Sequence, residues 1–256
     1  MAKIYVVANR KGGCAKTTTV GALSSGVGRK GYKVLAIDFD PQGNLTQWNR
    51  INAENIDTIY EVLHGEVKMS DVVQKGKYYD IVPSWDLLTT AESDFSTRVG
   101  REKILSDALV DVEDAYDFIF IDTPPALNLL NMMAFTAAKD GVLITSDASA
   151  FATQGMDKLV QTLDAVRKYY NPGCVVKGII IGRVNLKTNA FKIMRDFTSS
   201  FAEVVDAPVY KTCIRSGICV VNSQLASTDL LDEGTINKPI EDYYKLVDEF
   251  LERELD

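Results

Sequence analysis

The sequence predicts an α/β fold in which a doubly wound, mostly parallel sheet is flanked by helices. Three observations predict it. Short apolar segments rich in β-branched residues recur along the chain, helix-compatible segments separate them, and a glycine-rich loop joins the first strand to the first helix. Strands that alternate with helices pair in parallel through right-handed crossovers, so this order favours one continuous sheet.

The elements can be assigned in order along the chain. Buried strands are expected at residues 4–8, 34–40, 118–122, 141–146 and 175–181, and helices at 18–29 and 156–170. Residues 49–101 are the least regular and are expected to form small helices and an edge strand at 79–83. The 256 residues are 46% hydrophobic and carry no internal repeat or long linker, so a single domain over residues 1–256 is expected.

The loop at residues 11–18, Lys-Gly-Gly-Cys-Ala-Lys-Thr-Thr, has the features of a phosphate cradle. Its two glycines let backbone N–H groups approach an anion, and the following helix adds the positive end of its dipole. Lys16 is expected to reach the β- and γ-phosphates, and the Thr17 hydroxyl to bind a bridging magnesium ion. The residues expected to bind nucleotide are Gly12, Gly13, Cys14, Ala15, Lys16, Thr17 and Thr18.

This loop departs from the standard pattern G-x-x-x-x-G-K-[ST], because Arg10 stands at its first glycine and Ala15 at its last. A glycine-rich turn without a ligand is the alternative, and the acidic strand ends described next argue against it. Two interpretations of Cys14 stay open. It is either a reactive thiol, whose pKa the helix N-terminus would lower, or a side chain that fills a variable loop position.

Two of the predicted strands end in acidic residues. Asp38 and Asp40 end the strand at 34–40, and Asp122 ends the strand at 118–122. Parallel strands bring their carboxyl ends to one edge of a sheet, and hard cations prefer oxygen ligands. Asp38 and Asp122, with Thr17, are therefore candidate magnesium ligands. Aspartates at strand ends also cap the following turn or helix, and that structural role stays open for Asp38.

Together these motifs resemble the ParA/Soj branch of deviant Walker P-loop ATPases, which also contains MinD and the nitrogenase iron protein. The resemblance rests on KGGCAKTTT at 11–19, DFDPQGN at 38–44 and FIFIDTPPAL at 118–127, and it fades after about Val184. It implies the P-loop NTPase fold and an ATP hydrolase with weak intrinsic activity. ATP and Mg²⁺ are the implied cofactors.

The resemblance also implies the roles of single residues. Lys11 matches the signature lysine, which crosses a dimer interface to the partner's nucleotide phosphates, and it would act with Lys16 in catalysis. Asp40 matches the acid that positions the attacking water. Asp38 matches a neighbouring acid of the magnesium shell, and Asp122 the Walker B acid.

The resemblance leaves open what the ATPase cycle drives. In one hypothesis an ATP-bound homodimer binds DNA without sequence preference in plasmid or chromosome partition, and a ParB-like centromere-binding protein stimulates hydrolysis. In a second hypothesis, a MinD-like positioning ATPase acts on a membrane or protein partner without DNA. In a third, a metabolic or cofactor-handling ATPase uses the same scaffold, and no extra ligand cluster favours it. MinD-like membrane binding needs a basic amphipathic C-terminal helix. Residues 240–256 are periodic but acidic, so we expect that helix to dock onto the core and expect no membrane partner.

Charge complicates the DNA hypothesis, because the formal net charge of −7 is opposite to the usual footprint of a nucleic-acid binder. A local patch is required, and its candidate residues are Lys187, Lys192, Arg195, Lys211 and Arg215. A second family arginine, a few positions after Arg215, is replaced near Ile218 and Cys219. These basic residues fit an ordinary solvated face equally well.

Asn185 is the candidate for contacting adenine, and its rival role is to cap the next helix. The sequence starts without a signal-peptide pattern or long apolar run, so a cytoplasmic location is expected, nucleoid-associated if DNA binding holds. A loop that begins at Lys11 leaves no room for an N-terminal helix-turn-helix domain.

Overall fold

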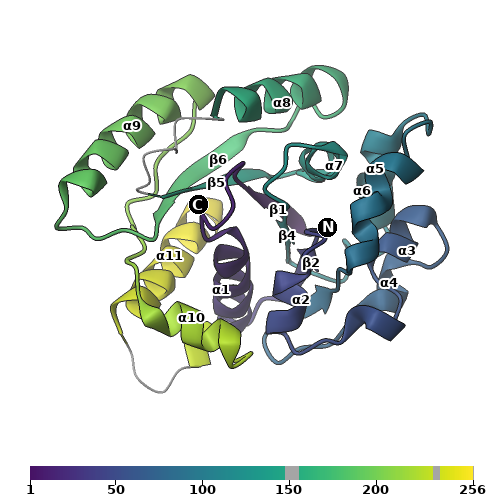
Figure 1. Cartoon of the computed structure of the whole chain (residues 1–256), viewed down its shortest axis with the longest axis horizontal. Helices are drawn as coiled ribbons and strands as arrows, with labels where there is room; N and C mark the ends of the chain where they lie inside the picture. The colour runs from purple at the N-terminus through teal and green to yellow at the C-terminus, as the bar shows by residue number, and fades with distance from the viewer. Residues whose placement is uncertain (148–155, 233–236, 256) are drawn as a thin grey trace.

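The computed structural model describes residues 1–147, 156–232 and 237–255 (Figure 1). Within them, six parallel strands form a sheet in the order β3-β2-β4-β1-β5-β6. The strands are β1 (Lys3–Ala8), β2 (Val34–Asp38), β3 (Asp80–Val82), β4 (Phe118–Asp122), β5 (Gly141–Asp147) and β6 (Val176–Gly182). The predicted fold class, an α/β parallel sheet flanked by helices, is confirmed. A single domain over the whole chain stays a prediction.

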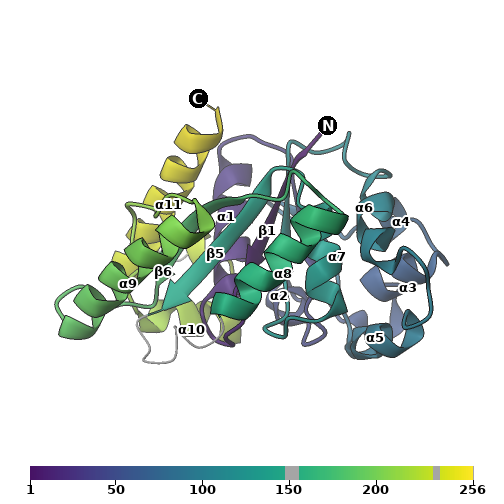
Figure 2. The ribbon, with the colours of Figure 1, turned by 90° about the horizontal axis from the view of Figure 1, so that it is seen from above.

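Helices cover both faces of this sheet. The longer ones are α1 (Lys16–Arg29), α7 (Leu129–Ala137), α8 (Met156–Tyr169), α9 (Asn189–Val205), α10 (Ile218–Leu225) and α11 (Lys238–Leu255). The shorter ones are α2 (Asn44–Trp48), α3 (Ile59–His64), α4 (Met69–Val72), α5 (Ala91–Asp94) and α6 (Ile104–Leu109). In Figure 2, α8 and α9 lie on the near side of the sheet and α1 and α11 on the far side.

Burial along β1 shows how the sheet separates two hydrophobic cores. Ile4, Val6 and Ala8 belong to the core that α7 and α8 cover, whereas Tyr5 and Val7 belong to the core that α1 and α11 cover. Successive side chains of a strand point to opposite faces, so a strand covered on both faces is apolar at every position. This explains why the strands could be recognised as continuous apolar runs.

The order of the strands places one loop at the centre of the molecule. The chain adds β2, β3 and β4 on one side of β1 and β5 and β6 on the other. Such a change of winding direction leaves a crevice at the carboxyl ends of the central strands, where ligands of open α/β sheets bind. The loop after β1 lies at this point.

Two predicted element boundaries differ from the structure by two residues, and the others by at most one. The strand predicted at 34–40 ends at Asp38, because the chain turns at Asp40, whose carbonyl accepts a hydrogen bond from the Gly43 N–H at 2.9 Å. The first helix begins at Lys16 rather than Thr18. Residues 49–101 contain short helices and the edge strand β3, as predicted.

The C-terminal helix α11 docks onto the core, as its periodicity predicted. Its buried face includes Ile240, Tyr243, Leu246, Val247, Phe250 and Leu251. The Phe250 ring packs against three rings of the sheet, with centroid distances of 5.1 Å to Tyr5, 5.8 Å to Phe118 and 5.4 Å to Phe120. The apolar face of α11 is therefore occupied within this chain.

Candidate nucleotide site

The glycine-rich loop connects β1 to α1 in the conformation that its glycines predict. Gly13 has a φ of +75°, and Ala15 has a φ of +62° in the left-handed region that favours glycine. Ala15 stands where the standard pattern has its last glycine, so the structure keeps the backbone shape although the residue type differs. A Cβ added at Gly12 would meet no atom within 4 Å, so the loop is open at this position.

A cavity of about 900 Å³ lies over this loop, within the size range of small-molecule sites. Six predicted nucleotide-binding residues line it, namely Gly12, Gly13, Ala15, Lys16, Thr17 and Thr18, and so does Asp40. Its opposite wall comes from α10 and the segment before it. That wall exposes the apolar side chains of Ile218 (71% exposed), Val221 and Leu225.

Lys16 and Cys14 differ in how they face this cavity. Lys16 is buried, and its Nζ lies 3.4 Å from the carbonyl oxygen of Lys11, inside the curve of the loop. Cys14 is buried and lies outside the cavity lining. Burial is the main cause that raises the pKa of the Cys14 thiol to about 11, and the negative charge of Asp147 is the second cause. The thiol is therefore protonated near neutral pH, which argues against the reactive-thiol interpretation.

Asp38 and Asp122 end adjacent strands in register with each other and are fully buried. Burial raises the pKa of Asp38 to about 6 and, with the charge of Asp38, raises that of Asp122 well above its usual range. Thr17 and Lys16 lie near enough to offset part of the rise at Asp122. Within the described chain, neither carboxylate oxygen of Asp122 has a hydrogen-bond partner. Two adjacent buried carboxyls, of which Asp122 is compensated only in part, fit a cation at this edge of the sheet.

The oxygen ligands at this site suit magnesium better than a metal ion that takes all its ligands from protein side chains. Among the described residues, no three His, Cys, Asp or Glu side chains are grouped to hold a metal ion. Magnesium commonly takes one or two carboxylates and completes its shell with water and substrate phosphates. Thr17 and Asp122 beside an open phosphate loop match that pattern.

Asp38 also has the structural role that the sequence left open. Its Oδ2 accepts hydrogen bonds from the Thr46 N–H at 2.8 Å and from the Thr46 hydroxyl at 2.7 Å, in the first turn of α2. Its Oδ1 accepts from the Asp40 N–H at 3.3 Å. Asp38 thus fixes the loop between β2 and α2.

Asp40 is held by contacts that sequence reasoning missed. Its Oδ1 accepts a hydrogen bond from the Gln42 N–H at 3.0 Å. Its carbonyl accepts one from the hydroxyl of the fully buried Ser84 at 2.8 Å, and the Ser84 N–H donates to the Thr46 hydroxyl at 2.9 Å. Ser84 follows the edge strand β3, so its approach to Asp40 depends on strand pairing that no local pattern reveals.

Lys11 lies at the mouth of the loop and pairs with a residue of β5. Its Nζ is 3.1 Å from Oδ2 of Asp147, and the Lys11 side chain is 35% exposed. The Lys11 N–H donates to the side chain of Asn9 at 2.9 Å, and Asn9 in turn donates to the Thr145 carbonyl. The start of the loop is therefore fixed to β5.

Arg183 is a second residue that the sequence analysis missed. It follows β6, lines the cavity and donates a hydrogen bond to the Gly13 carbonyl, although its φ is +54°. A left-handed backbone at an arginine is uncommon and is held here by contacts from separate segments. Its place two residues after the strand predicted at 175–181 could have drawn attention to it, but nothing in its residue type indicated a contact with the loop.

Asn185 lies outside the lining of the cavity. Its side chain accepts a hydrogen bond from the Lys187 N–H at 3.2 Å, and Thr188, not Asn185, caps α9 by accepting from the Phe191 N–H at 3.3 Å. The capping role considered for Asn185 is therefore wrong. Adenine contact by Asn185 stays a prediction.

The candidate DNA contacts fall into two groups. Lys187, Lys192 and Arg195 are exposed at the start and along the outer face of α9. Arg215 is different, because its guanidinium binds Asp242 of α11 at 2.6 and 2.7 Å and the Lys238 carbonyl at 3.1 Å.

Lys211 is exposed, and its backbone N–H donates a hydrogen bond to Glu249 of α11 at 2.8 Å. The structure therefore does not gather the five basic residues into one set of equivalent exposed cations. DNA contact by each of them stays a prediction.

Comparisons with known proteins give the relatives of this chain. Residues 2–176 match a protein family described as an AAA domain. The sporulation initiation inhibitor protein Soj of Bacillus subtilis is 32% identical over 218 residues, which cover 84% of each chain. The chromosome partitioning protein ParA of Caulobacter vibrioides is 30% identical over 261 residues, covering 99% of this chain and 96% of that protein.

A solved structure of similar shape is cobyrinic acid a,c-diamide synthase from Mycobacterium smegmatis with bound ADP and magnesium. It is 27% identical with a TM-score of 0.86, over 100% of this chain and 96% of that one. The same protein has a structure with a bound ATP analogue and magnesium, at a TM-score of 0.85. The three motifs, the fold and relatives that match nearly end to end agree, and the chain belongs to the ParA/Soj family of P-loop ATPases.

Proposed function

We propose that this chain is an ATP-dependent dimerising switch of the ParA/Soj type, which binds ATP with Mg²⁺ and hydrolyses it slowly. The observation that carries the proposal is the Asp122 carboxylate, which is fully buried next to Asp38 and whose burial Thr17 and Lys16 offset only in part, close to an open phosphate loop. A divalent cation there would compensate a charge that is otherwise expensive to bury. The M. smegmatis structures with ADP, or an ATP analogue, and magnesium support the proposal.

In this mechanism Thr17 and Asp122 hold the magnesium ion, and Asp38 supports it from the neighbouring strand. The ion would supply charge neutralisation on the β- and γ-phosphates. Lys16 moves its ammonium from the Lys11 carbonyl to the phosphates. Asp40, oriented by Gln42 and Ser84, positions the attacking water.

Lys11 acts across the dimer in this proposal. In the single chain its ammonium is paired with Asp147. Because phosphate oxygens carry more negative charge than one carboxylate, the nucleotide of a partner subunit can replace Asp147 as the site of that ammonium.

The biological output that we propose is partition of plasmid or chromosomal DNA, through nonspecific DNA binding and a ParB-like activator. The name of the Caulobacter vibrioides relative, a chromosome partitioning protein, supports it, and so do the exposed Lys187, Lys192 and Arg195. The alternative is a MinD-like positioning ATPase. The occupied apolar face of α11 favours the first output, because that face packs on the core. No described helix combines the length and apolarity needed to cross a membrane.

The test compares wild type, Lys11→Ala and Asp40→Ala in ATP and magnesium, with mass measured by light scattering and turnover by phosphate release. Asp40→Ala is expected to form the ATP dimer and to lose about tenfold or more of its turnover. Lys11→Ala is expected to bind ATP and stay monomeric. Unchanged turnover in Asp40→Ala would refute its role, and an ATP dimer of Lys11→Ala would refute action across the dimer.

A further inference from the structure

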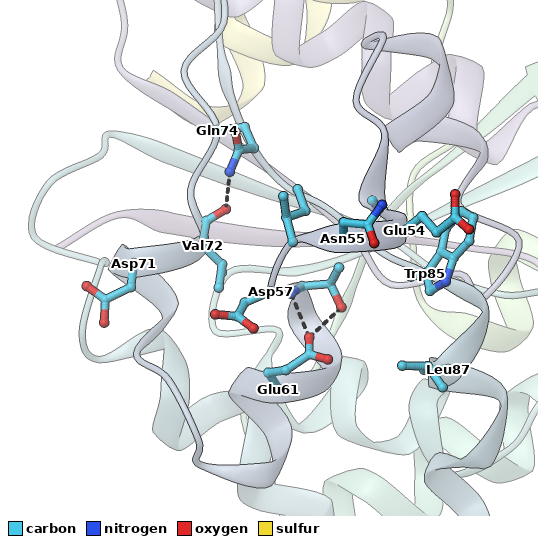
Figure 3. Close-up of a pocket in the computed structure, with 12 residues that line it drawn as sticks. Glu54, Asn55, Asp57, Glu61, Asp71, Val72, Gln74, Trp85 and Leu87 are labelled. Carbon is cyan, nitrogen blue, oxygen red and sulfur yellow. Dashed lines mark hydrogen bonds between the residues drawn. The ribbon is translucent and has the colours of Figure 1, made fainter.

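A second cavity, of about 490 Å³, lies apart from the nucleotide site among the segments that follow α2 (Figure 3). Its walls come from residues 53–58, from α3 and α4, and from the segment after β3. Figure 3 shows Glu54, Trp85 and Leu87 on one side of this pocket and Asp71 on the other, with Asp57 and Glu61 between them. It shares no lining residue with the cavity over the phosphate loop.

The lining of this pocket combines negative charge with exposed apolar surface. In the described chain, four of its twelve lining residues are acidic and none is basic. Two of the acids serve local structure, since Glu61 accepts hydrogen bonds from Thr58 at 2.6 and 2.9 Å and Asp71 accepts one from the Lys68 N–H at 3.4 Å.

Apolar side chains lie beside the acids. Ile56 is 39% exposed and Leu87 is 50% exposed. Trp85, which also lines the pocket, is half-buried. Exposed apolar side chains rimmed by carboxylates complement a peptide that carries both Lys or Arg and an aliphatic side chain. A small inorganic cation would leave the apolar part of the pocket unused.

The pocket is connected to the loop that carries Asp40. Trp85, in the pocket wall, follows Ser84, whose hydroxyl binds the Asp40 carbonyl at 2.8 Å. Pro83 precedes Ser84, and its carbonyl accepts a hydrogen bond at 2.9 Å from the N–H of Ile59, in the first turn of α3. A ligand that moves Trp85 or α3 therefore acts on the segment that holds Asp40.

We propose that this pocket docks a cationic, partly aliphatic segment of a partner protein, and that docking is transmitted to the Asp40 loop through Ser84. The transmission rests on the proposed function, because its consequence is a change in hydrolysis. Docking itself does not, since it follows from the charge and shape of the pocket. Ser84 is a positioning residue in this scheme.

The test uses a fluorescent peptide, Arg-Leu-Arg-Lys-Leu-Arg, titrated without nucleotide onto the full chain. Wild type is expected to bind it, and Glu54→Lys/Asp57→Lys to bind at least about tenfold more weakly. The matched control is Asp107→Lys/Glu252→Lys, which changes the net charge equally at exposed positions elsewhere and is expected to stay within about twofold of wild type. Equal affinities for all three proteins, or no binding to wild type, would overturn the proposal. Displacement of the peptide by equimolar spermidine would show a general cation site and would also overturn it.

Transmission is measured by hydrogen exchange, which needs no turnover. Peptide binding is expected to change exchange of the amides at residues 40–46 in wild type. In Ser84→Ala the peptide should bind with similar affinity and leave those amides unaffected. A response in Ser84→Ala equal to that of wild type would remove Ser84 from the scheme. Failure of wild type to hydrolyse ATP would count against the proposed function alone.

Discussion

Asp122 carries an electrostatic cost that the folded chain does not offset by itself. Its carboxyl is fully buried next to Asp38, and the nearby Thr17 and Lys16 offset only part of the cost of its charge. An uncompensated buried carboxylate responds by a raised pKa, which is the direction found at both acids. A carboxyl whose pKa is higher in the folded than in the unfolded chain makes stability fall as pH rises from about 4 through the folded-state pKa.

Asp122→Asn is therefore expected to stabilise the nucleotide-free protein at about pH 8 more than at about pH 5, where the folded carboxyls are largely protonated. An increase in melting temperature of about 2–4 °C corresponds to about 1 kcal/mol in a chain of this size. The same variant should lose most of the stabilisation that ATP and magnesium give to wild type. Thermal unfolding at both pH values, with and without ligand, measures both effects.

Asp107→Asn is the control for this comparison, because Asp107 is exposed and its substitution should change neither the pH dependence nor the ligand effect. An Asp122→Asn variant less stable than wild type at the higher pH would contradict the argument. A full ligand effect in that variant would remove Asp122 from the magnesium site.

The residues that sequence reasoning found and missed differ in a physical way. Gly13, Lys16 and Asp122 belong to motifs whose residue types follow from their chemistry, so local patterns were sufficient. Ser84 and Arg183 act through tertiary contacts with Asp40 and Gly13, more than 40 residues away in sequence. Such contacts depend on the order of the strands in the sheet. The sequence predicts the fold class but not that order.

At the scale of elements, α11 does more than cover the sheet. Its buried face packs Phe250 against the aromatic side chains of β1 and β4. Its acids hold the segment before α10, since Glu249 accepts from the N–H groups of Lys211 and Thr212 and Asp242 accepts from that of Arg215. The acidic face that argued against lipid binding thus has a structural role, which the charge pattern alone did not reveal.

Phe250→Ala is expected to destabilise the chain by about 3–5 kcal/mol, because it removes a fully buried ring and leaves a cavity between α11 and the sheet. Leu255→Ala on the same helix is the control. Leu255 is 55% exposed, so its loss should cost less than about 1 kcal/mol. Urea unfolding of both variants measures the difference, and similar losses would contradict the docking of α11 through Phe250.

Three of the basic residues proposed to contact DNA lie together at one end of the molecule. Lys187, Lys192 and Arg195 lie on and beside α9, at the opposite end of the molecule from α3 to α6 (Figures 1 and 2). The acidic pocket lies at that other end, lined in part by α3 and α4. A net charge of −7 therefore does not exclude a local attraction for phosphates near α9.

Lys192→Ala/Arg195→Ala is expected to weaken binding of the ATP-bound protein to random-sequence duplex DNA, without a change in thermal stability. Both side chains are exposed, and Arg195 has one weak ion pair, to Asp196 at 4.0 Å. If each contacts one phosphate, the slope of log affinity against log salt should fall by about 2 per subunit. Titrations at several salt concentrations, with ATP and with ADP, measure this slope.

Two further variants decide how this result is interpreted. Lys68→Ala/Lys103→Ala removes the same charge at exposed positions near the other end of the molecule and should leave the salt slope unchanged. Arg215→Ala should act mainly on stability, because its guanidinium is engaged by Asp242. If both double variants reduced the slope equally, attraction would come from overall charge and not from a patch on α9. If none of the proteins bound DNA while the ATP dimer formed, the output of the switch would be a protein partner, for which the acidic pocket is the candidate surface.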